Sequence, residues 1–156
     1  MNIKELSTKI VELTKVNTEY LSSISKILKI NFHQVEQGEY ILGIGPKNIK
    51  QYQSKGFDSD SILSLVEVKF YTAEGENLSI ISVSLAEGVN VYIEDIIDTA
   101  SITEIDLKVI PEIDSCLITY PVYGSDVTFY QTIGDNYKLT QITIKLMQKE
   151  CCSGQT

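Results

Sequence analysis

The stretch ISVSLAEGVNVYIE, residues 81–94, places an apolar residue at every second position on either side of Glu87-Gly88. Successive side chains of a strand point to opposite faces, so this spacing predicts two strands, each with one face on a core and one in water. The same alternation recurs five more times between Leu65 and Leu146. These further runs are VEVKF (66–70), IDLKV (105–109), CLITYPV (116–122), VTFYQTI (127–133) and QITIKL (141–146).

Turn-forming residues separate the predicted strands. Glycine tolerates positive φ, and asparagine and aspartate bond their own backbone, so such clusters predict tight turns. Connections this short favour antiparallel pairing of neighbouring strands. Strands that are apolar on one side only fit an antiparallel sheet with one face exposed to solvent. Pro121 lies inside one of these runs, and it has no N–H group to donate to a neighbouring strand. We therefore expect that strand to lie at an edge of the sheet or to bulge at Pro121. The turn signals are Glu74-Gly75-Glu76-Asn77, Glu87-Gly88, Gly124-Ser125-Asp126 and Gly134-Asp135-Asn136.

The N-terminal segment has helical periodicity instead. Asn2 is a candidate N-cap, and Glu5 is its partner in a capping box. Two interpretations remain: one helix to about Lys29, or two helices broken near Asn17-Thr18, which the β-branched residues there favour. The apolar stripe consists of Ile3, Leu6, Ile10, Leu13, Tyr20, Ile24 and Ile27.

The segment from Asn31 to Ile44 is ambiguous. Gln37-Gly38 can turn a hairpin between Ile30–Glu36 and Glu39–Ile44. Proline suits the first turn of a helix, so Pro46–Ser54 is predicted to be helical and to end at Gly56.

These patterns predict an α+β fold, with an N-terminal helical layer packed on one twisted, mainly antiparallel sheet of about six or seven strands. A chain of 156 residues suits one domain, for which we expect residues 1–149, with a flexible tail over 150–156. The chain shows no apolar run of membrane-spanning length and no signal-peptide core, so we expect a cytoplasmic protein.

The charges are concentrated in the middle of the chain. All thirteen basic residues are lysine, and the formal net charge is −8. Residues 58–114 carry thirteen acids against two lysines, a net charge of −11. Nucleic acids and anionic membranes bind basic patches, so neither is an expected partner. A concentrated acidic surface steers a basic protein instead, although acidic loops can also serve only solubility.

The sequence offers no strong catalytic or metal-binding motif. His33 is the single histidine, and it has no nucleophile signature beside it. Cys151-Cys152 near the C-terminus, with Cys116, forms neither a disulfide framework nor a zinc motif. Gly43-x-Gly45-Pro46-Lys47 lacks the rest of a dinucleotide or phosphate-loop pattern. We therefore expect no enzyme activity, no metal and no cofactor.

The candidate site is a partner-binding surface built from acids and tyrosines of the middle segment. Tyrosine suits interfaces because it buries a large area with little loss of entropy and keeps a polar tip. Tyrosine is also simply common on strands, so the pattern admits both interpretations. The candidate contact residues are Glu67, Tyr71, Glu74, Glu76, Tyr92, Glu94, Asp95 and Asp98.

The leading hypothesis is a non-enzymatic protein-binding module. Its size and charge fit a small acidic bacterial inhibitor of the immunity-protein type, a monomer or dimer that neutralises a basic partner such as a toxin. One alternative is a structural subunit of a phage-tail-like or secretion assembly that pairs through an exposed edge strand. A secretion chaperone, which also tends to be small and acidic, is another. An enzyme or small-ligand binder on the sheet's concave face remains a further one.

Overall fold

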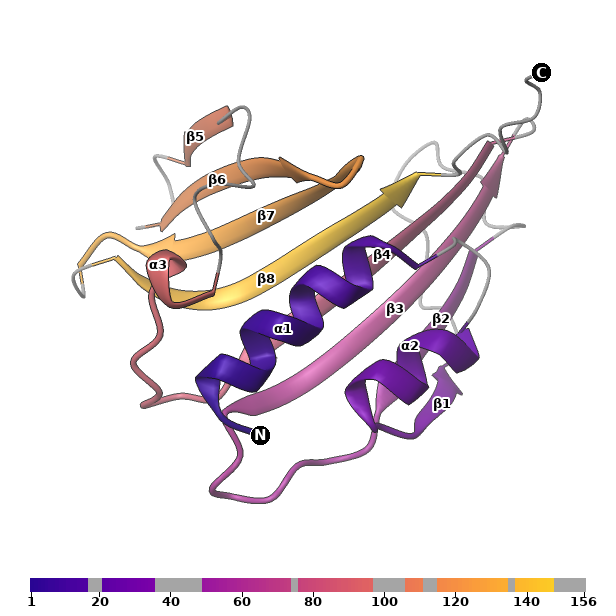
Figure 1. Ribbon diagram of the computed structural model, residues 1–156, viewed down its shortest axis with the longest axis horizontal. Helices are drawn as coiled ribbons and strands as arrows, with labels where there is room; N and C mark the ends of the chain where they lie inside the picture. The colour runs from indigo at the N-terminus through magenta and orange to yellow at the C-terminus, as the bar shows by residue number, and fades with distance from the viewer. Residues whose placement is uncertain are drawn as a thin grey trace.

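The computed structural model describes residues 1–16, 21–35, 49–73, 76–96, 106–110, 115–134 and 137–147 (Figure 1). Its helices are α1 (Ile3–Thr14), α2 (Leu21–Leu28) and α3 (Ile93–Ile96). Its strands are β1 (Phe32–Val35), β2 (Ile49–Ser54), β3 (Leu63–Ala73), β4 (Glu76–Leu85), β5 (Asp106–Ile110), β6 (Ser115–Val122), β7 (Ser125–Thr132) and β8 (Lys138–Met147).

The strands form one antiparallel sheet in the order β1-β2-β3-β4-β8-β7-β6-β5. Each half, β1–β4 and β5–β8, is a meander of sequential neighbours, and the last strands of the two halves pair with each other. The chain passes from β4 through α3 to the far edge and returns inward along β6, β7 and β8. The predicted α+β class is confirmed, with eight strands in the described residues.

The helices α1 and α2 cover one face of the sheet (Figure 1). The stripe predicted for α1 is its buried face, since Leu6, Ile10 and Leu13 are at most 1% exposed. Facing residues of the central strands complete the core, because every second side chain of a strand points to the same face. The fully buried strand residues include Val66, Val68, Ile81, Val83, Val127, Phe129, Ile142 and Ile144.

The N-terminal segment forms two helices, as the β-branched cluster favoured. The Asn2 side chain accepts a 2.8 Å hydrogen bond from the Glu5 N–H, which confirms the predicted N-cap of α1. α1 ends at Thr14 and α2 begins at Leu21. The predicted break at Asn17-Thr18 falls outside the described residues. In the described part of the chain no helix is long and apolar enough to cross a membrane.

The strand predicted for residues 89–94 is wrong. Residues 89–92 belong to no strand, and Ile93–Ile96 form the single turn of α3. Ile93 and Ile96 are both buried, so the three-residue spacing between them serves a helical turn packed on the core. Asp95 at the third helical position accepts a 2.9 Å hydrogen bond from the Tyr92 N–H, half of a capping box.

The helix predicted for Pro46–Ser54, with Gly56 as its cap, is also wrong. Ile49–Ser54 is β2, which pairs with β1 on one side and with β3 on the other. The apolar residues Ile49 and Tyr52 are three positions apart, as on one face of a helix. Pairing with a strand on each side outweighs that local spacing. β1 therefore has β2 as its partner, while the hairpin predicted with Glu39–Ile44 lies outside the described residues.

Pro121 lies at a position where the lack of a backbone N–H removes no hydrogen bond between described strands. Among the described residues, β5 pairs with Ser115–Thr119 of β6, so Pro121 lies beyond the last described pair. In that part of the chain β6 has no partner opposite Pro121 on the β5 side, as the sequence predicted. The adjacent turn comprises Tyr123 and Gly124, with φ of 50° and 80°, which is the backbone of a two-residue type I′ hairpin.

Candidate functional site

Two acidic loops meet at the end of the sheet where β3 begins and β4 ends. Asp58 and Asp60 lie between β2 and β3, and Glu87 lies in the turn after β4; all three are exposed. Antiparallel pairing of β3 with β4 brings the loops together, and the Ala86 N–H donates a 2.8 Å hydrogen bond to the Ile62 carbonyl. The acids of two separate segments therefore share one surface.

The helix α3 adds two further carboxylates at this end of the molecule. Glu94 and Asp95 are exposed, because the residues on either side of them point into the core. The segment is fixed to β8 by a 2.8 Å hydrogen bond from the Leu139 N–H to the Val91 carbonyl. Figure 1 shows α3 beside the first residues of β8. We call the following exposed carboxylates the acidic end: Asp58, Asp60, Glu87, Glu94 and Asp95.

The N-terminal helix supports the position of α3. The Ser7 hydroxyl donates a hydrogen bond to the Ile96 carbonyl, the last residue of α3. α1 also contacts α3 directly. A helix of one turn has little stability by itself, so these contacts and its buried isoleucines hold it in place.

Glu94 also acts on the buried ring of Tyr120 in β6. Tyr120 is 8% exposed and packs edge-on against Phe129, with ring centroids 5.6 Å apart. Burial, together with the negative charge of Glu94, raises the pKa of Tyr120 above its ordinary value. The phenol is therefore held neutral, which suits a packing role and not that of a general base.

Glu67 lies on the face of the sheet that no described helix covers. Its Oε2 accepts hydrogen bonds from Nε2 of Gln51 at 2.7 Å and from Nε2 of Gln53 at 3.3 Å. Both donors belong to β2, the neighbouring strand. This carboxylate already has partners within the fold, so it is a weaker candidate for a partner contact than the acids of the acidic end.

The same face carries a polar row that crosses β1 to β4 and β6 to β8. The strand register aligns one polar residue from each of these seven strands, and we call this set the transverse row. Thr119 and Thr128 of this row share a 2.9 Å hydroxyl contact, while the buried Oγ1 of Thr143 has no hydrogen-bond partner among the described residues. The transverse row consists of His33, Gln53, Glu67, Ser82, Thr143, Thr128 and Thr119.

The structure brings together only part of the predicted contact surface. Glu94 and Asp95 lie with Tyr92 on α3 and the residue before it. Glu76 is the first residue of β4, and the acidic end lies beyond the last, ten strand residues or about 30 Å away.

The remaining predicted contact residues lie away from the acidic end or outside the described residues. Glu67 and Tyr71 lie on β3, both half-buried, and share the face of the transverse row. Glu74 and Asp98 fall outside the described residues. Asp58, Asp60 and Glu87 were missed, because only the β3–β4 pairing shows that they adjoin α3; the turn sequences that hold them were the available signal.

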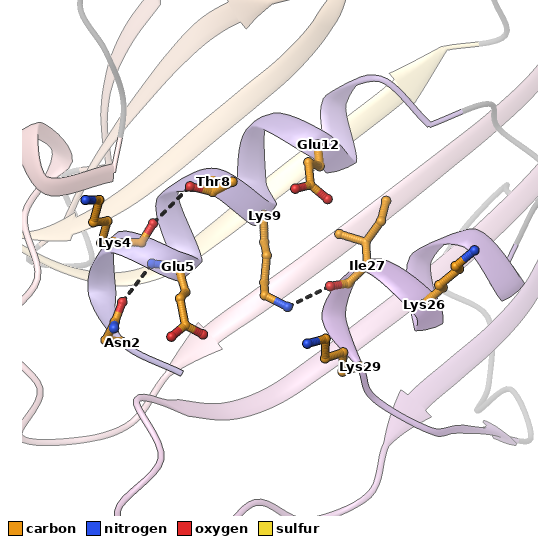
Figure 2. A pocket seen from close by; sticks show the side chains of 9 residues that line it. All are labelled: Asn2, Lys4, Glu5, Thr8, Lys9, Glu12, Lys26, Ile27 and Lys29. Carbon is orange, nitrogen blue, oxygen red and sulfur yellow. Dashed lines mark hydrogen bonds between the residues drawn. The ribbon is translucent and has the colours of Figure 1, made fainter.

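A groove of about 560 Å³ lies between α1 and α2 (Figure 2). Nζ of Lys9 donates a 2.7 Å hydrogen bond to the Ile27 carbonyl in the last turn of α2, where a cation is favourable. Four lysines and two glutamates line the groove, which gives its lining a net charge of +2. We interpret it as the seam between two helices. Its lining is Asn2, Lys4, Glu5, Thr8, Lys9, Glu12, Lys26, Ile27 and Lys29.

The candidates for chemistry are scattered through the described residues. His33 is exposed on β1, which has one partner strand among the described residues, and it is opposite Gln53 of β2 in register. Cys116 is a buried free thiol on β6. Among the described residues, no three His, Cys, Asp or Glu side chains are grouped so that they could hold a metal ion.

One apolar feature of the surface was predicted incorrectly. Ile133 was assigned to the buried face of its strand, yet it is 38% exposed beyond the end of β7. The burial alternation continues unbroken through β7 as far as Gln131, which is buried. Ile133 has the parity of that buried face, but it lies past Thr132, where the strand ends. Tyr137, across the same hairpin, is 54% exposed. The turn residues next to Ile133 were the signal that its strand ends there.

Comparison with protein-family models, with curated proteins and with solved structures gives no match.

Proposed function

We propose that this chain is a non-enzymatic protein-binding module, a small acidic inhibitor of the immunity-protein type that neutralises a basic protein such as a toxin. The observation that carries the proposal is the acidic end, where three segments contribute five exposed carboxylates. Clustered carboxylates attract a basic partner and accelerate its association.

The placement of the acids supports binding better than solubility alone. Charges that serve only solubility are dispersed over a surface and mixed in sign. Here two loops and α3 bring carboxylates of the same sign to one end of the sheet, on backbone fixed by the Ala86–Ile62 and Leu139–Val91 hydrogen bonds. A rigid surface loses little entropy on binding, which suits an inhibitor.

The proposal includes the setting in which the protein acts. We propose a monomer or dimer in the cytoplasm that uses no cofactor and binds neither nucleic acid nor membranes. The net charge of −8 disfavours both of those anionic partners.

The test compares two single charge reversals in protein isolated from its own cells. Glu94→Lys changes the acidic end, whereas Glu12→Lys makes the same change on α1; both glutamates are exposed and helical. Native mass spectrometry should show one stoichiometric basic partner with the unchanged protein and with Glu12→Lys. Glu94→Lys should slow association by about tenfold. Equal binding by both variants would contradict the proposal.

A second candidate function rests on the two open edges of the sheet. β1 and β5 each have a described partner on one side only, and an unpaired edge is a template for another chain. A structural subunit that pairs through these edges would appear in the same spectra as homo-oligomers without a basic partner.

A further inference from the structure

Two tyrosines at opposite ends of β7 have the same unusual setting. Tyr123 is 55% exposed with φ of 50°, and Tyr137 is 54% exposed with φ of 63°. Residues with a β-carbon adopt this left-handed conformation at a cost, and glycine or asparagine is the usual occupant. A large exposed ring in such a position calls for an explanation.

The fold explains Tyr123. The Lys15 Nζ lies 4.5 Å from the centroid of its ring, a cation–π contact with the residue that follows α1. Nearby, the Ser125 hydroxyl donates a 2.8 Å hydrogen bond to the Thr14 carbonyl. The β6–β7 hairpin is thereby attached to α1, and the ring of Tyr123 is part of that attachment.

Tyr137 has no comparable ring contact among the described residues. With Ile133 it leaves two large apolar side chains exposed on one hairpin, the β7–β8 hairpin. This hairpin lies beside α3 in Figure 1, and the Leu139–Val91 hydrogen bond fixes its base to the segment that begins α3. Tyr137 is two residues from Leu139, and Glu94 is three residues from Val91, so the exposed ring and this carboxylate belong to two segments that are bonded to each other.

We propose that the β7–β8 hairpin and α3 together bind an arginine- and lysine-bearing extended segment of a partner protein. The face of the Tyr137 ring takes one cation, Ile133 contacts the apolar stem of that side chain, and Glu94 and Asp95 pair with a second cation. This arrangement gives the interface an aromatic anchor with an acidic rim, the usual distribution of binding energy in interfaces. The inference rests on the proposed function, whose partner it describes.

The experiment uses a phage-displayed library of random peptides as the probe, selected on the unchanged full-length protein. Peptides that bind should carry arginine or lysine next to apolar residues. Tyr137→Gly should weaken their binding by about tenfold or more, as removal of an aromatic anchor does. Tyr123→Gly is the matched control and should change it less than about twofold. Glycine suits both backbone positions, so loss of the ring is separated from strain.

The outcomes separate this inference from the proposed function. Basic peptides that lose affinity with Glu94→Lys but not with Tyr137→Gly would overturn the hairpin as an anchor and leave the acidic end as the binding surface. Peptides without basic residues, or no peptide above the unselected library, would overturn the hairpin inference itself. A basic partner found in cells would still support the proposed function in that case.

Discussion

The Ser125 hydroxyl donates a buried 2.8 Å hydrogen bond to the main-chain carbonyl of Thr14, a residue 111 positions earlier in the chain. The bond joins the first residue of β7 to the last residue of α1. It fixes the end of the helix on the half of the sheet formed by β5–β8. Because the two elements are so distant in sequence, their contact depends on the complete fold.

Replacing Ser125 should therefore destabilise the protein. Ser125→Ala removes a buried donor and should lower the free energy of unfolding by about 1–2 kcal/mol. Ser59→Ala, in an exposed loop, is the control and should stay within about 0.5 kcal/mol. Urea denaturation followed by circular dichroism measures both. Equal stability of the two variants would mean that the helix and the hairpin are not coupled.

The pair of Tyr120 and Glu94 predicts a loss of stability in alkali. Burial and the Glu94 charge raise the pKa of Tyr120 in the folded protein above the value near 10 that it has when unfolded. The folded state then holds this proton more tightly than the unfolded state. The stabilisation is complete below about pH 10 and is lost as pH rises through the raised pKa.

Substitutions distinguish the two causes of this shift. Glu94→Gln removes the charge and should lower the pKa of Tyr120 part of the way, since burial is the larger cause. Tyr120→Phe removes the titrating group and should reduce the alkaline loss of stability. Tyrosinate absorbance and thermal melts across pH 9–12 measure the two effects. An unchanged pKa in Glu94→Gln would show that Glu94 does not face this ring.

The sheet was predictable because period-two alternation is a local property of each strand. Val66 and Val68 in β3, like Ile142 and Ile144 in β8, are buried as the alternation required. The same criterion failed at residues 89–94, where the alternation is real but a single capped turn packs Ile93 and Ile96 on the core. In a segment of only six residues, a tertiary contact outweighs the local pattern.

The site was less predictable than the sheet. The sequence shows that acids are concentrated between residues 58 and 114, yet not which of them are neighbours in space. That depends on register: Leu63 pairs with Leu85, and so Asp60 and Glu87 share one end of the sheet. The Gln51–Glu67 contact and the transverse row also depend on which strands are neighbours. The sequences of the individual strands do not determine that order.

Two isoleucines test where the buried alternation of β7 ends. Ile144 is fully buried in β8, whereas Ile133 is 38% exposed beyond the last residue of β7. Ile144→Ala should cost about 2–5 kcal/mol of unfolding free energy through the lost burial and the cavity left behind. Ile133→Ala should cost less than about 1 kcal/mol. Denaturant titration measures both, and a large loss for Ile133→Ala would place it in the core, as the plain alternation had predicted.

Salt gives the last test, because carboxylates at an exposed surface act over distances that ions screen. Raising the ionic strength from about 0.05 M to about 0.5 M shortens the screening length from about 14 Å to about 4 Å. Association with a basic partner should slow by about tenfold or more, while dissociation changes much less. Stopped-flow mixing at several salt concentrations measures both rates. Glu94→Lys should flatten the dependence of the association rate on salt, and Glu12→Lys should leave it largely unchanged. An association rate that does not depend on salt would contradict electrostatic steering by the acidic end.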